Sequence, residues 1–142
     1  MPGSSQVARS SHALEEHTGE LKLRIEAPSL PDLFAEAGKA LAEAMGAPEG
    51  EGVPVEKRIE VEASDRDALL VDWLNELVFL AEAEKMIFRE FRVELPSEGR
   101  LLALARGARV ERLRNPVKAA TYHALAITAR PQGFVATVVL DV

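Results

Sequence analysis

The stretch "ELKLRIEAPSLPDLFAEAGKALAEAM", residues 20–45, changes its hydrophobic period partway along. In 20–27 apolar and charged residues alternate strictly, which predicts a β-strand with one buried face. From 29 onward the apolar residues recur every three or four positions, which predicts an amphipathic helix over 29–45. Ser29 suits the N-cap of this helix, and Gly46 supplies a stop signal. A strand followed directly by a helix indicates a fold that contains both elements.

The rest of the chain carries more strands than helices. A strand is predicted over 55–63 and a second helix over 68–84, with Ser64 as its N-cap. This helix is apolar on most sides, so we expect it to lie buried between other layers. Four further strands are predicted over 85–96, 99–110, 117–129 and 133–142. The order β-α-β-α-β-β-β-β with tight turns predicts a single α+β domain, in which a mainly antiparallel sheet packs on two helices.

The composition of the 142 residues excludes several classes of protein. The net charge of −6 argues against a general nucleic-acid binder, because neutralising phosphates requires clustered Lys and Arg. We therefore expect no DNA contact, and we expect any RNA contact to be local or made through a partner. The absence of cysteine excludes disulfides, Cys-based zinc sites and thiol nucleophiles. No run is apolar enough for a signal peptide or a membrane span, so we expect a cytoplasmic domain over 15–142 behind a disordered leader, 1–14.

The closing "FVATVVLDV", 134–142, is an apolar strand that carries a carboxylate near its tip. Asp141 stands one residue before the α-carboxylate of Val142, and two such negative charges repel each other. Solvent, a lysine or a metal ion could offset this repulsion. Glu20, at the start of the first strand, could serve as an oxygen ligand for a hard cation. Alternatively, the polar "EEHTGE" at 15–20 could simply hydrogen-bond the strand's entry through His17.

"VKAATYH", 117–123, places further polar side chains in a predicted strand. Alternation puts Lys118 and Tyr122 on one face, and puts Thr121 and His123 on the other face with Leu125. Lys118 could be an exposed charge that protects the strand from pairing with another chain, or it could lie over a carboxylate site or bind phosphate. A lone histidine such as His123 is more often structural than a metal ligand.

Two surface features are weaker signals. Asp72, Asn75 and Glu76 fall within one turn of the second helix, and we expect them to form a solvated edge. Four arginines gather within nine residues of this acidic chain and could meet an acidic or RNA-bearing partner, although a plain hairpin surface is the simpler interpretation. They are Arg106, Arg109, Arg112 and Arg114.

Five segments together resemble the archease family in order and spacing. They are "HTGELKLRI", "DLFAEAGKAL", "DWLNELVFL", "VKAATYHAL" and the terminal "VVLDV", and the resemblance spans about 15–142. Archeases are small α+β proteins that act as cofactors of the RtcB-type RNA ligase, which joins RNA ends in tRNA splicing and RNA repair. The resemblance implies that this chain promotes guanylylation of the ligase histidine and multiple turnover, without catalysing ligation itself.

The resemblance also implies a divalent-metal site. The family pattern begins His-Thr-Ala-Asp and ends in an Asp one residue before the terminus, and here Asp141 and Val142 match that end. Glu20 stands where the first Asp is expected, and Ca²⁺ tolerates the longer side chain better than Mg²⁺ does. Lys118 matches the family lysine and becomes the candidate for ligase activation, with His17 and His123 as further docking candidates.

Two other functions stay open at this point. A metal-dependent hydrolase could use Glu20, Asp141 and His123, because carboxylates and histidine can hold a metal that activates water. The chain could also be a general chaperone or modulator of RNA-modifying enzymes. The sequence lacks a recognisable ligand spacing for the first and a Met-rich adaptable surface for the second.

Overall fold

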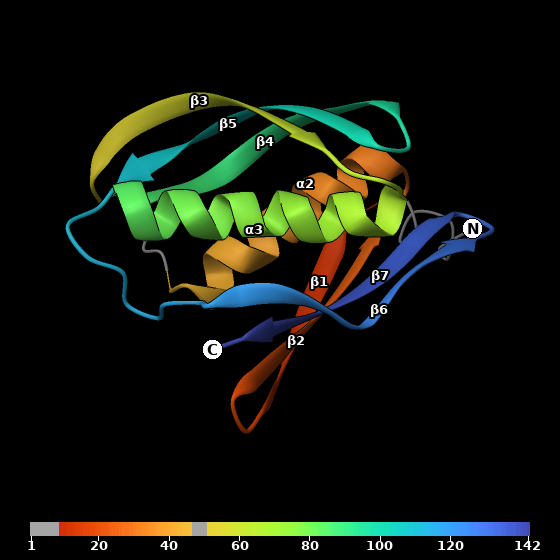
Figure 1. Ribbon diagram of the computed structural model, residues 1–142, viewed down its shortest axis with the longest axis horizontal. Coiled ribbons are helices and arrows are strands. Elements are labelled where there is room, and N and C mark those ends of the chain that lie inside the picture. The colour runs from red at the N-terminus through yellow and green to blue at the C-terminus, as the bar shows by residue number, and fades with distance from the viewer. Residues whose placement is uncertain (1–8, 47–50) are drawn as a thin grey trace.

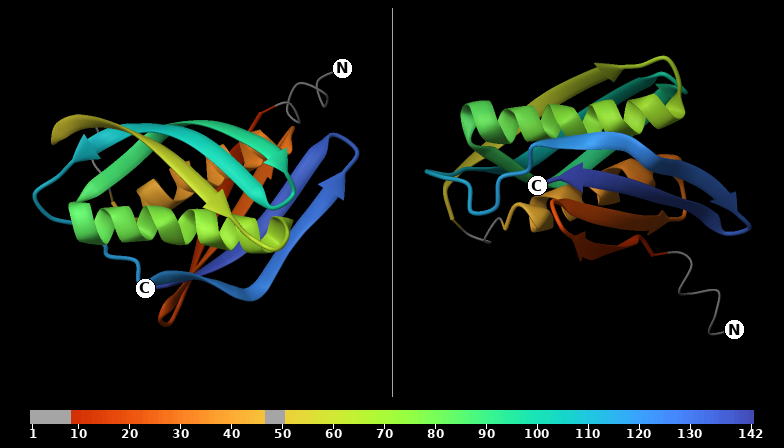
Figure 2. Two further views of the ribbon diagram at one scale, coloured as in Figure 1. Left: turned by 45° about the horizontal axis from the view of Figure 1, so that its top comes forward. Right: turned by 60° about the horizontal axis from the view of Figure 1, so that its bottom comes forward.

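The computed structural model describes residues 9–46 and 51–142, which form two antiparallel sheets with two helices between them (Figure 1). Sheet A has four strands in the order β1-β2-β7-β6, and sheet B has three in the order β3-β5-β4. The strands are Ser11–His17 (β1), Glu20–Ala27 (β2), Val53–Glu62 (β3), Met86–Ser97 (β4), Arg100–Arg109 (β5), Ala119–Arg130 (β6) and Gly133–Asp141 (β7). The helices are Leu30–Ala44 (α2) and Arg66–Glu84 (α3), and each contacts strands of both sheets (Figure 2).

The predicted α+β class is confirmed, with one more strand and one more sheet than expected. β1 precedes the first predicted strand and pairs with β2 through a tight turn in which Gly19 has a φ of 75°. Residues 11–14 therefore lie in a strand, and the predicted leader boundary at residue 14 is wrong. Residues 1–8 of that predicted leader lie outside the described part of the chain. The sequence "SHALEEH" does not predict a strand, because it contains few apolar residues.

Both predicted helix starts are close to the observed ones. The Ser29 hydroxyl caps α2 by accepting a hydrogen bond from the Asp32 N–H at 3.3 Å, as expected. The predicted Ser64 cap of α3 is wrong by one residue, because Asp65 accepts from the Ala68 N–H at 2.8 Å. An ionised carboxylate is the stronger acceptor and also interacts favourably with the positive end of the helix dipole.

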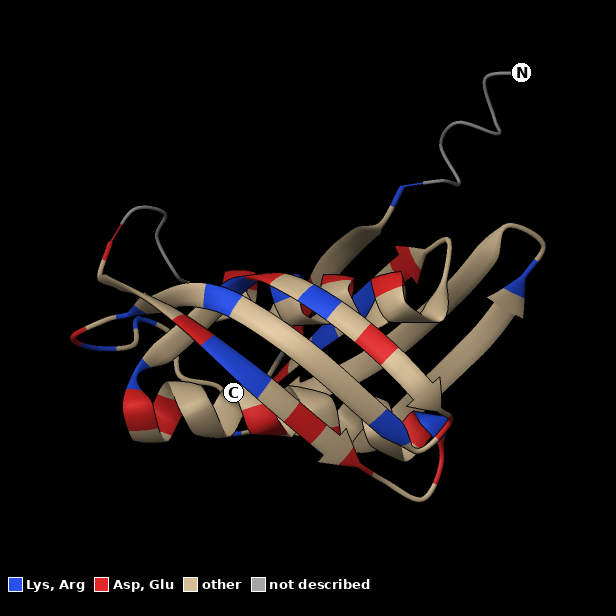
Figure 3. Ribbon diagram, turned by 90° about the horizontal axis from the view of Figure 1, so that it is seen from above, with Lys and Arg blue, Asp and Glu red and all other residues tan. Residues whose placement is uncertain are grey.

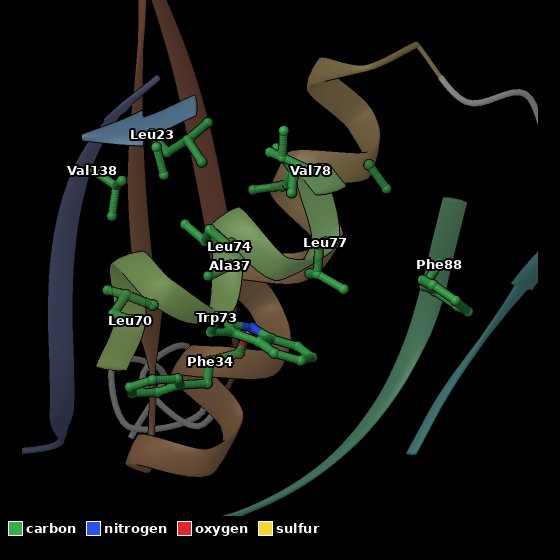
Figure 4. Close-up of a cluster of buried hydrophobic side chains, with 14 of the residues drawn as sticks. Leu23, Phe34, Ala37, Leu70, Trp73, Leu74, Leu77, Val78, Phe88 and Val138 are labelled. Atoms are coloured by element: carbon green, nitrogen blue, oxygen red, sulfur yellow. The ribbon is translucent and has the colours of Figure 1, made fainter. Parts of the chain in front are cut away.

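The core lies where α3 passes between the sheets (Figure 4). Trp73 is fully buried, its indole N–H donates to the Phe34 carbonyl at 2.9 Å, and its ring meets Phe91 edge-on at 5.5 Å. Gly38 of α2 allows this close packing, because a Cβ there would lie 2.7 Å from the Phe91 ring. The buried residues of α3 point in several directions, which confirms the prediction of a helix buried between layers. Neither helix in the described part of the chain is long and apolar enough to cross a membrane.

β1 is attached to α2 by a histidine between two carboxylates. The His12 Nδ1 lies 2.6 Å from Glu36, which is itself buried, and the Nε2 contacts Glu43. Only the imidazolium form can donate from both ring nitrogens. Desolvation by burial lowers the pKa of His12, but hydrogen bonds to Glu43 and Glu36 and the charges of both outweigh it, so the pKa is raised above 6.5.

This cluster predicts a pH-dependent stability. Because the folded pKa of His12 is raised, its contribution is fully present below pH 6.5 and is lost as the pH rises through the folded pKa. We expect His12→Gln to cost about 1 kcal/mol of unfolding free energy near pH 6 and to flatten this pH dependence. Urea unfolding of both proteins at about pH 5.5 and about pH 8.5 measures the difference. Parallel pH profiles for the two proteins would contradict the assignment.

Candidate functional site

The candidate site lies at one end of sheet A, where β2 meets β7. The antiparallel register of these strands places Glu20 directly opposite Asp141. The next residues along, Gly19 and Val142, are joined by a hydrogen bond from the Val142 N–H to the Gly19 carbonyl at 3.2 Å. Because bonded and non-bonded pairs alternate in an antiparallel ladder, Glu20 and Asp141 form a non-bonded pair, in which side chains approach most closely. Two acidic residues more than a hundred positions apart in the chain therefore lie together.

Lys118 lies beside this pair on the β6 side. Its N–H donates to the Asp141 carbonyl at 2.8 Å, and the next residue, Ala119, is the register partner of Asp141. The Lys118 side chain is exposed. This backbone bond thus fixes the position of Lys118 at the same end of sheet A as Glu20 and Asp141.

Asn75 of α3 holds the start of β6 in place. Its Nδ2 donates to the Ala120 carbonyl at 3.1 Å and its Oδ1 accepts from the Ala120 N–H at 2.7 Å. The expected solvated edge is therefore wrong for Asn75, which acts as a positioning residue two positions from Lys118. An amide in a mostly apolar helix is the one sequence signal that could have found it.

Asp72 and Tyr122 form a second, exposed link between α3 and β6. The Tyr122 hydroxyl donates to Asp72 at 3.4 Å. Desolvation of the hydroxyl, followed by the charge of Asp72, the hydrogen bond to Asp72 and the charge of Asp65, raises the pKa of Tyr122. The Tyr122 side chain remains 59% exposed and marks an aromatic surface at this end of β6.

The two histidine candidates are placed differently. The backbone of His17 pairs with Glu20 in the β1–β2 ladder, so one row across sheet A contains His17, Glu20, Asp141 and Ala119. His123 lies in an irregular part of β6, where the register with β7 shifts between Thr121 and Ala126. Ala124 there has a φ of 55°. This irregularity ends the expected alternation after Thr121 and keeps His123 out of the row.

The residues of the site suit a hard cation. Glu20 and Asp141 offer carboxylate oxygens and Val142 offers main-chain oxygen, which are the donors that Ca²⁺ and Mg²⁺ prefer. Within 9–46 and 51–142, no cluster of three or more His, Cys, Asp or Glu side chains is placed to hold a metal. A cation here would accordingly share two carboxylates and complete its shell with main-chain oxygen and water. The hydrolase alternative, which requires His123 as a third ligand, gains no support from this geometry.

The four candidate arginines lie at the end of β5 and in the following loop. The Arg106 Nε donates to Glu56 at 2.6 Å, and Arg114 donates to Glu51 at 3.3 Å. The Arg109 Nε donates to the Glu84 carbonyl at 3.4 Å, while Arg112 is exposed. Because glutamates neutralise part of the arginine charge, this surface carries both positive and negative side chains. The loop that carries it leads directly to Lys118, so both features lie at the same end of the molecule (Figure 1).

Comparison with known proteins gives a consistent result. Residues 12–142 match the model of the Archease protein family (MTH1598/TM1083). Protein archease of Methanopyrus kandleri is 36% identical over 135 residues, covering 89% of this chain and 95% of the relative. Protein archease of Methanosarcina barkeri is 31% identical, again over 135 residues, with coverage of 89% and 92%.

Solved structures show the same fold. The solution structure of protein 1598 of Methanobacterium thermoautotrophicum superposes with a TM-score of 0.78 and 28% identity, covering 92% of this chain and 98% of that one. A Thermotoga maritima archease, described as a possible chaperone, superposes with a TM-score of 0.68 at 21% identity, covering 90% and 94%. The family match over nearly the whole chain and the full-length relatives agree with the resemblance of the five sequence segments, and this chain belongs to the archease family.

Proposed function

We propose that this chain is a protein cofactor of an RtcB-type, GTP-dependent RNA ligase in tRNA splicing and RNA repair. In this role it promotes guanylylation of the ligase histidine and allows multiple turnover, and it reaches tRNA through the ligase. Family membership supports the role. The observation that supports it most directly is the register pairing of Glu20 with Asp141 together with the backbone bond of Lys118 to Asp141, which brings these three residues to one end of sheet A.

The carboxylates of this site shape its docking surface. Glu20, Asp141 and the main-chain oxygen of Val142 would hold Ca²⁺ or Mg²⁺, with Ca²⁺ favoured by the length of the Glu20 side chain. The ion would supply positive charge that offsets the repulsion between the two carboxylates. The paired β2 and β7 backbones then hold the acidic groups in fixed positions, so that they can dock near the metal-rich guanylylation centre of the ligase.

Lys118 contributes the opposite charge at the same surface. Its backbone bond to Asp141 and the Asn75 clamp on Ala120 restrict where the side chain can reach. From that position the ammonium group can contact a phosphate or carboxylate of the ligase–nucleotide complex. The net charge of −6 disfavours independent binding to tRNA, which is consistent with action through the ligase.

A turnover assay tests the function. We expect a ligase that stalls after about one product per molecule to continue through many cycles when this chain is added at roughly one tenth of the ligase concentration, because a catalytic activator is reused. Product per ligase is followed with excess RNA ends and GTP. The chain is treated with chelator and desalted before mixing, since chelator added later would strip the ligase metals. A correctly folded chain that gives no stimulation of the cognate ligase would refute the proposal.

A further inference from the structure

The solvent face of sheet B carries an apolar line down its central strand. Along β5, Leu101, Ala103 and Ala105 point into the core, so Leu102 and Leu104 point to the opposite face. The solvated face of an antiparallel sheet normally carries polar residues. Here the two leucines form the floor of a trough of about 790 Å³. Its walls are formed by Arg58, Glu60, Arg92 and Glu94.

The charges of the walls are arranged in two rows. Leu104 is flanked by Arg58 on β3 and by Arg92 on β4, which together form the arginine row. Leu102 is flanked by Glu60 on β3 and Glu94 on β4, which form the glutamate row. The rows are two residues apart along the strands, about 7 Å. Figure 3 shows positive and negative bands following each other along both edge strands of this face.

Most of these charges are not neutralised within the chain. Glu60 accepts a hydrogen bond from Arg100 at 3.0 Å. Across the described residues, no intrachain ion pair involves Arg58, Arg92 or Glu94. The next row outward does pair internally, because Arg106 bonds Glu56 at 2.6 Å. Three of the four wall charges beside the apolar floor, those of Arg58, Arg92 and Glu94, thus remain available to a partner.

We propose that this face binds a second copy of the same chain, sheet against sheet, about a two-fold axis that is perpendicular to the strands and passes between the two rows. This operation places the arginine row of one protomer over the glutamate row of its partner. It also stacks Leu102 on Leu104 in both directions. A two-fold axis parallel to the strands would instead bring Arg58 over Arg92, so the charge pattern selects one of the two arrangements.

The dimensions of packed sheets agree with this arrangement. Face-to-face sheets lie about 10 Å apart, a gap that leucine side chains fill and that Arg and Glu side chains can span. The face lies on the side of sheet B away from both helices (Figure 1). Pairing there leaves Glu20, Asp141 and Lys118, which belong to sheet A and its rim, uncovered. The proposal is therefore independent of the ligase role.

Charge-reversal variants of the full chain test the dimer by sedimentation velocity at about 50 mM salt. Arg58→Glu with Arg92→Glu makes both rows negative, and Glu60→Arg with Glu94→Arg makes both rows positive. We expect each double variant to weaken dimerisation at least 100-fold, because like charges then face each other. An equimolar mixture of the two, and the variant that carries all four changes, should both recover dimerisation to within about threefold of the wild type.

A matched control variant shows whether dimerisation depends on the complementary charges of the two rows or only on the net charge of the chain. Lys39→Glu with Arg130→Glu changes the net charge as much as the double arginine reversal does, but at exposed positions outside sheet B, and should dimerise normally. Circular dichroism confirms that each variant is folded. A wild type that stays monomeric up to about 0.5 mM would overturn the proposal, as would double variants that still dimerise. A monomeric wild type that captures the ligase through this face, with capture lost in Leu104→Glu, would assign the trough to the ligase instead.

Discussion

Asp141→Asn is expected to reduce stimulation of the ligase at least tenfold while leaving the fold intact. The substitution keeps the size of the side chain but removes one of the two carboxylates that face each other across β2 and β7. The remaining Glu20 offers a single charged ligand, which weakens any cation held there. Lys118→Ala should show a similar loss, because it removes the positive charge beside Asp141. Multiple-turnover ligation with equal amounts of each variant measures the effect.

The control for this experiment is Glu26→Gln on the same face of β2 but at its far end. Glu26 is exposed and bonds Arg24 at 3.0 Å, so its neutralisation should leave stimulation unchanged. Thermal melts provide a second readout: Ca²⁺ in excess should raise the Tm of the wild type but not that of Asp141→Asn. Without added cation, Asp141→Asn should be slightly more stable than the wild type, because like charges placed directly opposite destabilise a sheet. Normal stimulation by both Asp141→Asn and Lys118→Ala would show that the site lies elsewhere.

Trp73→Ala is expected to lower the unfolding free energy by about 3–5 kcal/mol. The indole is fully buried between the sheets, and its removal leaves a cavity beside Phe91 and eliminates the hydrogen bond that the indole donates to the Phe34 carbonyl. A loss of this size is a large part of the total stability of about 5–15 kcal/mol that a domain has. Urea unfolding followed by circular dichroism measures it, since the variant lacks the only tryptophan.

Phe79→Ala provides the matched control for the tryptophan variant. Phe79 lies on the same helix but is 57% exposed, so the change should stay within about 0.5 kcal/mol. Trp73→Phe should fall between the two, because it keeps an aromatic ring and loses the hydrogen bond to Phe34. Equal losses for Trp73→Ala and Phe79→Ala would contradict the description of the core.

Local periodicity predicts most of the elements but not their arrangement. The alternation of 20–27 and the helical spacing of 29–45 match β2 and α2 closely, because each pattern reflects one buried face. β1 is missed because an edge strand buries little of its surface and its sequence alternates poorly. The division into two sheets is also missed, since strand order depends on pairings such as β3 with β5 that no local pattern encodes.

In the candidate site, as in the fold, the sequence indicates features that depend on local patterns and misses those that depend on long-range contacts. Asp141 attracts notice by itself as an acid at the tip of an apolar strand, but its partner Glu20 is indicated by the family resemblance and not by any spacing. Asn75 is misjudged because its bonds to Ala120 span 45 residues. His123 is misplaced because an irregularity in β6 depends on the pairing with β7, which the chain's period of two does not reveal.

Because β7 lies inside sheet A, between β2 and β6, we expect the candidate site to form late in folding. β1 with β2, β4 with β5, and β6 with β7 are hairpins whose ends are close in the chain, and such local contacts form early. The β2–β7 ladder joins residues more than a hundred positions apart, so its formation has a larger loop-closure entropy cost than that of any of the three hairpins. Glu20 belongs to the first of these hairpins and Asp141 to the last, so their juxtaposition exists only after the two hairpins have docked. We therefore expect a partly folded chain, in which these two hairpins have not yet docked, to lack the paired acidic residues.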